Sequence, residues 1–165
     1  MENRDLGVFL NYFGRIHQRT MRVVRCTPPD KLDWSFREGK FTIGDLARHI
    51  ATSKRYLFAE TLGGRPSRYA GCGRELAPSL EETLLLMEAL HREAFEIVSG
   101  LTDLNRECRT PDGASIATWK WMRAMVEHEI HHRGQVYTYL ALLDVPTPPL
   151  FGLTSEQVAE RSKGA

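Results

Sequence analysis

Histidines stand closest together in residues 127–133 of this 165-residue chain, where three of its six histidines fall. His128 and His132 are four residues apart, so on a helix their imidazoles project from one face and can share a metal ion. They also belong to a run of residues spaced alternately by four and three, which predicts a single inward-facing seam. The run consists of Trp121, Met125, His128, His132, Gln135, Tyr139 and Leu142. His131 lies about 100° around the helix from His132, on the flank of that seam.

Two histidines in a bundle seam admit two interpretations. Imidazoles inside a protein are costly unless their polar atoms are satisfied, so the pair is either hydrogen-bonded within the core or bound to a metal. The metal hypothesis requires a third ligand. His49 is the best candidate, because it borders the apolar stripe of an earlier predicted helix. His17 is a weaker candidate, and His91 is weaker again.

The same segment also matches the His-Glu-x-x-His pattern of zinc peptidases, with Glu129 as the base. This alternative is less favoured. Five residues match often by chance, and no His-x-x-Gly-x-x-His follows downstream. The chain also lacks the alternating pattern of the strands that border such an active site.

Helices must position these histidines, and prolines divide the chain into stretches long enough to form them. Proline removes a backbone donor and disrupts a helix interior, so its absence from these stretches supports helices. Apolar residues recur there at spacings of three and four. The pattern predicts an all-α four-helix bundle with long inter-helix loops and helices near residues 5–26, 42–62, 80–101 and 117–144. The first two connections are long enough to allow either parallel or antiparallel neighbours.

Smaller signals refine this outline. Ser79 and Glu82 have the spacing of a capping box at the start of the third predicted helix, and a weaker form occurs at Thr42. A proline–aspartate–glycine turn favours a short hairpin within residues 103–116. Gly134 lies inside the last helix, where close helix approach is the expected reason. We expect one metal-binding domain over residues 1–150 and a C-terminal tail, polar or briefly helical, over 151–165.

Composition excludes several functional classes. The 22 basic and 21 acidic residues nearly cancel, which argues against a general nucleic-acid binder. No run of about 18 apolar residues could span a membrane, and the N-terminus lacks a secretory signal. The three cysteines are far apart in the sequence, which favours free thiols and a cytoplasmic location. The loop arginines Arg65, Arg68 and Arg74 form either a solvated loop or an anion-binding segment.

Two stretches resemble the DinB family, whose members are also called YfiT-like metalloproteins. Residues 32–50 are similar to the family's aromatic loop leading into the first histidine, and residues 128–135 to its His-x-x-x-His-Arg-Gly-Gln ending. The resemblance implies a four-helix bundle, a homodimer, and one divalent metal on His49, His128 and His132. Some members resemble transferases or isomerases that use low-molecular-weight thiols such as bacillithiol or mycothiol, whereas many have no assigned reaction.

The proposed ligand set suggests a reaction but does not define it. Three imidazoles leave a metal position open for water or a thiol, and zinc or nickel would suit them. Gln135, Arg133, Tyr139 and Glu129 are candidates for supporting the ligands or contacting a small-molecule substrate. The favoured hypothesis is a metal-dependent S-transferase or hydrolase. The alternative is a non-catalytic metal-binding bundle with a structural or stress-response role.

Overall fold

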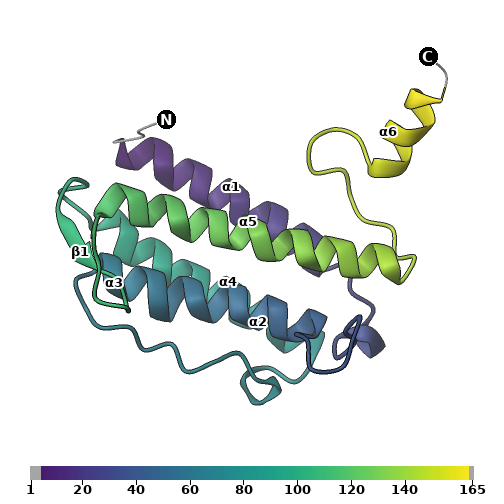
Figure 1. The fold of residues 1–165 in the computed structure, drawn as a ribbon, viewed down its shortest axis with the longest axis horizontal. Helices are drawn as coiled ribbons and strands as arrows, with labels where there is room; N and C mark the ends of the chain where they lie inside the picture. The colour runs from purple at the N-terminus through teal and green to yellow at the C-terminus, as the bar shows by residue number, and fades with distance from the viewer. Residues whose placement is uncertain (1–4, 164–165) are drawn as a thin grey trace.

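Four long helices dominate the computed structural model, which describes residues 5–163 (Figure 1). Their bounds agree closely with the prediction, and the all-α class is confirmed. The second helix is one continuous rod in which a π-helical stretch, η2, links two α-helical parts. The components are α1 (Leu6–Val24), α2 (Ile43–Ser53), η2 (Lys54–Ala59), α3 (Glu60–Leu62), α4 (Leu80–Ser99) and α5 (Thr118–Leu142).

Side-chain caps fix where these helices begin. Ser79 and Thr42 each accept a hydrogen bond from the backbone three residues on, while the acidic residue there bonds back to the cap. These are complete capping boxes, so both predicted starts are confirmed. Asp5 caps α1 by accepting a hydrogen bond from the Val8 amide.

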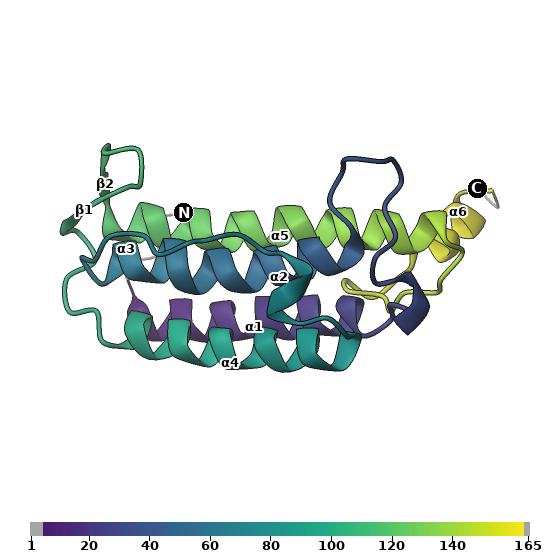
Figure 2. The ribbon, with the colours of Figure 1, turned by 90° about the horizontal axis from the view of Figure 1, so that it is seen from below.

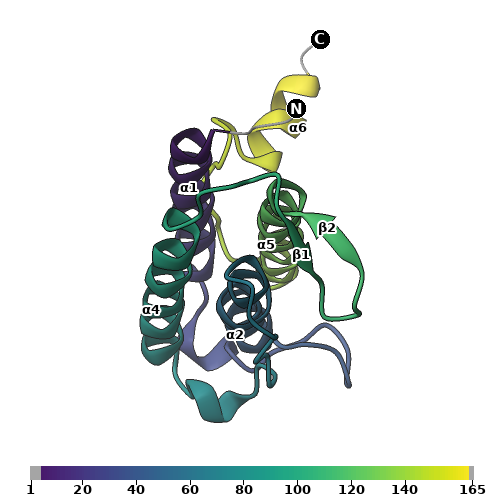
Figure 3. The same cartoon turned by 90° about the vertical axis from the view of Figure 1, so that its left-hand side faces the viewer.

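The helices form a ring in the order α1, α4, α2, α5, as the end-on view shows (Figure 3). Arg48 of α2 donates a hydrogen bond to the carbonyl of Ala77, three residues before α4 begins, and α2 and α4 run in the same direction (Figure 2). α1 and α5 run together in the opposite direction (Figure 1). α2 and α5 are therefore antiparallel neighbours, and this pair carries the candidate ligands.

Long connections make this order possible. Residues 25–42 include the short helix η1 (Pro29–Lys31), and residues 63–79 return along the whole length of α2 before η3 (Arg74–Leu76) (Figure 2). The predicted hairpin is present: β1 (Glu107–Arg109) pairs antiparallel with β2 (Ser115–Ala117). Its turn includes Gly113 at φ 86°, a left-handed conformation that favours glycine.

The core-facing stripe of α5 differs from the predicted seam. The prediction is wrong at Leu142, which is 60% exposed. An α-helix has 3.6 residues per turn, so a strict seven-residue repeat drifts by about 20° per heptad and leaves the core. The buried positions of α5 include Met122, Met125, Val126, Glu129, Arg133, Val136, Tyr139 and Leu140.

Gly134 also departs from expectation. It is exposed, and a Cβ added there would meet no other group within 4 Å in the described structure. Close helix approach is therefore not the reason for this glycine.

The C-terminal segment ends in α6 (Ser155–Ser162), the helical one of the two forms considered for it. Within the described residues, α6 buries no side chain, and Figure 1 shows it standing away from the bundle. Residues 1–4 of the expected domain and 164–165 of the expected tail lie outside the described residues. Among the described helices, none combines the length and apolarity needed to cross a bilayer.

Candidate metal centre

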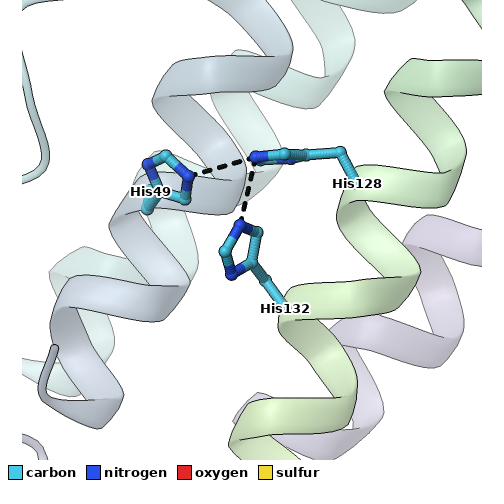
Figure 4. Close-up of side chains that lie close together, drawn as sticks. All are labelled: His49, His128 and His132. Atoms are coloured by element: carbon cyan, nitrogen blue, oxygen red, sulfur yellow. Dashed lines mark hydrogen bonds between the residues drawn. The ribbon is translucent and has the colours of Figure 1, made fainter.

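Three imidazoles converge between α2 and α5. His49 comes from α2, while His128 and His132 stand one turn apart on α5, and all three point toward one another (Figure 4). The Nε2 atom of His128 lies 3.1 Å from Nε2 of His49 and 3.1 Å from Nε2 of His132. One donor atom from each residue lies within 4.8 Å of the others. All three side chains are half-buried, so the cluster lies at the edge of the core.

This donor set fits a divalent cation. A tetrahedral zinc ion with bonds of about 2.05 Å separates its nitrogen ligands by about 3.3 Å, close to the spacing of the Nε2 atoms. The nitrogens make poor partners for one another without a cation, because one Nε2 proton on His128 can serve only one of its two contacts. A cation at the point of convergence would satisfy all three lone pairs together.

The other ring nitrogens of two ligands have partners that favour this role. Nδ1 of His132 lies 2.7 Å from the Gln135 side-chain oxygen, which can only accept a hydrogen bond. Nδ1 therefore carries the proton and leaves Nε2 bare for a metal. Gln135, three residues after His132 on α5, lies beside the candidate centre.

Tyr69 orients the third ligand from the loop between α3 and α4. Its hydroxyl lies 2.7 Å from Nδ1 of His49. The Tyr69 hydroxyl can accept the Nδ1 proton of His49, and in that tautomer the His49 Nε2 is bare as well.

Burial keeps these imidazoles neutral. Burial and then the charge of His132 lower the pKa of His49 to about 4. Burial and then the charges of His132 and His49 lower the pKa of His128 to about 3. Burial also lowers the pKa of His132. Near pH 7 all three nitrogen lone pairs are therefore available, as metal ligation requires.

The structure separates the other residues of the histidine segment from the point of convergence. His131 is exposed, and its ring centroid is 4.9 Å from that of His132, outside the group of converging nitrogens. Glu129 and Arg133 are 1% and 4% exposed and face the bundle interior. Successive helix positions differ by about 100°, so ligands at 128 and 132 place their following neighbours on the core face.

Glu129 is the partner of a buried lysine. The Lys54 ammonium lies 2.8 Å from its carboxylate, and the two side chains are 2% and 1% exposed. Lys54 also lies 3.3 Å from Nδ1 of His17 and 3.5 Å from Nδ1 of His91. The ammonium therefore forms an ion pair with Glu129 and hydrogen bonds with two imidazoles. The weaker ligand candidates His17 and His91 belong to this lysine site, and Glu129 is not positioned as a peptidase base.

His17 and His91 stack on each other with ring centroids 3.8 Å apart. Burial and then the charge of Lys54 lower the pKa of both residues, to about 3 for His91. Both rings are therefore neutral acceptors toward the ammonium. The remaining nitrogen of His17 lies 3.2 Å from the Glu88 carboxylate and donates to it.

Aromatic residues lie beside the candidate centre. The Phe41 ring, 44% exposed, has its centroid 5.6 Å from that of His49. Phe36 is 52% exposed, and its ring centroid lies 5.5 Å from that of Tyr139. Tyr139 also packs edge-on against Trp34. Tyr139 is thus a packing residue of this aromatic group. Residues 33–41 form a loop that rises beside α2 and α5 (Figure 2).

Sequence analysis missed Tyr69 and Lys54. Tyr69 lies in an irregular loop twenty residues after His49, where no helical period links it to a ligand. Lys54 sits in the π-helical stretch, whose wider turn shifts the face on which its residues lie. The available signal was a carboxylate on the core-facing stripe of α5, because a buried carboxylate needs a cation close to it.

Comparisons with known proteins agree with the fold. A DinB-like protein from Bacillus cereus ATCC 10987 superposes with a TM-score of 0.72 at 18% identity, covering 86% of this chain and 94% of that one. A DinB-like protein from Bacillus subtilis gives 0.66 at 18% identity over 86% and 96%. YfiT from Bacillus subtilis gives 0.69 at 17% identity over 88% and 91%, and is described as a probable metal-dependent hydrolase with an unusual four-helix bundle topology.

Sequence comparison supplies the family. Curated proteins give no match. The sequence profile of the DinB superfamily matches residues 12–136, a span that holds His49, His128 and His132 as well as all four long helices in whole or large part. The chain belongs to the DinB superfamily.

Proposed function

We propose that this protein is a metal-dependent enzyme that acts on a small molecule, as a hydrolase or a thiol-dependent S-transferase. The observation that carries the proposal is the convergence of three neutral imidazoles. Nε2 of His128 lies 3.1 Å from Nε2 of His49 and 3.1 Å from Nε2 of His132. YfiT, a structural neighbour, is described as a probable metal-dependent hydrolase. A three-histidine set is also typical of catalytic rather than structural zinc sites, which use four protein ligands.

His49, His128 and His132 would hold the ion, and zinc or nickel suits these ligands. A bound divalent metal lowers the pKa of a coordinated water or thiol and so supplies a nucleophile near neutral pH. Gln135 and Tyr69 keep the Nδ1 protons of two ligands away from the metal side. They also fix the ring orientations, which limits the rearrangement needed on binding.

The surroundings suggest what part of a substrate would bind. Phe41 and Phe36 offer exposed ring faces next to His49 and Tyr139. Such faces favour an apolar or aromatic group on the substrate. A small electrophile of this kind, together with a low-molecular-weight thiol, is the substrate pair that we propose for transferase activity.

Metal analysis combined with two activity assays tests the proposal. The purified protein, loaded with zinc or nickel, is assayed for hydrolysis of an aryl ester and for transfer of a low-molecular-weight thiol to an aromatic electrophile. We expect one of these activities to depend on the metal and on His132, but not on His131. A protein that binds one metal ion yet shows neither activity would instead favour a non-catalytic metal-binding bundle.

We also propose that the chain forms a homodimer. α6 has eight residues and buries no side chain within the described chain, although helices this short are unstable alone in water. Phe151, just before it, is 77% exposed, and α1 exposes Val8 and Tyr12. A second copy covering these residues would account for them. Sedimentation equilibrium should give twice the chain mass, and a monomer mass at micromolar concentration would reject the dimer.

A further inference from the structure

A second candidate site lies at the end of the bundle where the hairpin meets α3. A cavity of about 640 Å³ opens between residues 61–67 and residues 106–111. This volume falls within the range typical of small-molecule sites. Figure 2 shows α3 and the hairpin at the same end of the molecule. Thr61 is twelve residues beyond His49, or roughly 18 Å along the helix at 1.5 Å per residue, so the cavity is distinct from the metal centre.

Arginines surround this cavity and a smaller one next to it. Arg65, Arg106 and Arg109 line the larger cavity, while Arg55, Arg65 and Arg68 line the smaller one. We call these five residues the arginine cluster. Arg65 belongs to both cavities, so the cluster is continuous.

A buried carboxylate organises three of the five. Glu60, 1% exposed, accepts hydrogen bonds from Arg55 at 2.5 Å, from Arg68 at 2.6 Å and from Arg65. Burial alone would raise the pKa of Glu60, but the hydrogen bonds from the three arginines outweigh it and lower the pKa to about 2. The glutamate is therefore always charged, and it holds the guanidinium groups in fixed positions.

The remaining arginines are placed by the hairpin. Arg106 donates a hydrogen bond of 2.8 Å to the carbonyl of Leu62, which leaves other N–H groups of its guanidinium for a ligand. Arg109 lies on β1, and within residues 5–163 it has no ion-pair partner. Among the residues that line this cavity, Glu107 on the same strand supplies the carboxylate.

The charges in this region are of both signs. The lining of the larger cavity itself holds three arginines and one carboxylate, that of Glu107. Arg65 is also paired with Glu60, while Glu96 and Asp103 line a neighbouring cavity that Arg65 and Arg106 share. Glu107 is also engaged, since its carboxylate accepts a hydrogen bond of 2.5 Å from Ser115.

We propose that the arginine cluster binds a phosphate-bearing small molecule in the larger cavity. A phosphate monoester carries close to two negative charges at neutral pH, and in the larger cavity it would meet three arginines and one carboxylate. The planar guanidinium fork also fits phosphate oxygens in pairs. The volume of the cavity suits a small molecule. The site requires no metal, so it stands or fails independently of the metal-dependent activity.

Titration with inorganic phosphate and with pyrophosphate tests the proposal on the full chain. Binding is followed by calorimetry and by amide chemical shifts of residues 61–67 and 106–111, with chloride at matched ionic strength as the reference. We expect saturable binding, tighter for pyrophosphate. Arg109→Gln should weaken it by about threefold to tenfold, since one charge-assisted contact is lost.

Arg74→Gln is the matched control. It removes the same charge from η3, between α3 and α4, where Arg74 pairs with Asp33 and does not line the cavity. Its affinity should stay within about twofold of the wild type. Because Arg106 also supports the fold, the Arg106→Gln and Arg109→Gln changes are compared separately, with unfolding curves recorded for each. Absence of saturation, or equal weakening by Arg74→Gln, would overturn the proposal. Tighter binding of a short DNA duplex that displaces phosphate would overturn it too.

Discussion

Replacing Lys54 with methionine should destabilise the protein strongly. The substitution keeps most of the side-chain volume but removes the ammonium 2.8 Å from Glu129. The carboxylate then stays in the core without its counter-ion, and its oxygens form no well-aligned hydrogen bond to other described residues. Two further acceptors, the Nδ1 atoms of His17 and His91, lose their donor as well.

The burial of the pair sets the expected magnitude. Lys54 and Glu129 are 2% and 1% exposed, so water cannot replace the lost partner. Breaking such a pair from one side typically costs about 3–5 kcal/mol. We expect Lys54→Met and Glu129→Leu each to lower the free energy of unfolding by about that amount. The double variant should lose less than either single variant, because two apolar side chains leave no unpaired charge.

A double-mutant cycle by urea denaturation, followed by circular dichroism, measures this coupling. Single-variant losses below about 1 kcal/mol, or losses that add within about 0.5 kcal/mol, would refute the argument. The double variant also tests the peptidase hypothesis. We expect it to keep any metal-dependent activity, whereas an enzyme that uses Glu129 as its base would lose that activity.

Four further changes test the structure. Tyr69→Phe and Gln135→Leu should each lower zinc affinity by about tenfold to a hundredfold in a chelator competition, because partners of ligating histidines fix their tautomers; changes under about twofold would contradict this. The metal-free protein should lose stability as the pH falls from about 6.5 towards 3, because unfolded histidines take up protons that folded His17 and His91, with their lowered pKa values, do not. Urea curves at pH 7 and pH 5 measure this, and equal stabilities would contradict it. Gly134→Ala should raise the free energy of unfolding by about 1 kcal/mol, since the exposed site has room for the methyl group; a loss of stability would show a hidden constraint.

Local signals predicted the helices well. Proline positions and apolar spacing set the four helices, and capping residues such as Ser79 marked a start that the structure reproduces. These signals act within a few residues of one another, which is why one sequence suffices to find them. The order of the helices was not predictable in this way, because the long connections permit several arrangements.

The candidate site was predicted in part. The four-residue spacing of His128 and His132 placed them together, and His49 was the best third candidate because it borders an apolar stripe, as the family resemblance also implied. Contacts between distant segments were missed, since Tyr69 reaches His49 from a loop and Lys54 meets Glu129 across the bundle. The predicted core-facing side of α5 was also wrong at its end, because a seven-residue repeat follows a straight helix poorly over several turns. Glu129 and Arg133, which lie on its core face, were expected to support the ligands or to contact a substrate.

The central claim is that His49, His128 and His132 bind one divalent ion through the geometry in Figure 4. Zinc titration of the metal-free protein against a competing chelator, with His132→Ala and the matched neighbour His131→Ala, tests it most directly. We predict one ion per chain for the wild type and for His131→Ala, and loss of most binding for His132→Ala. Loss of the ion in His131→Ala with retention in His132→Ala, or retention in both, would contradict the account.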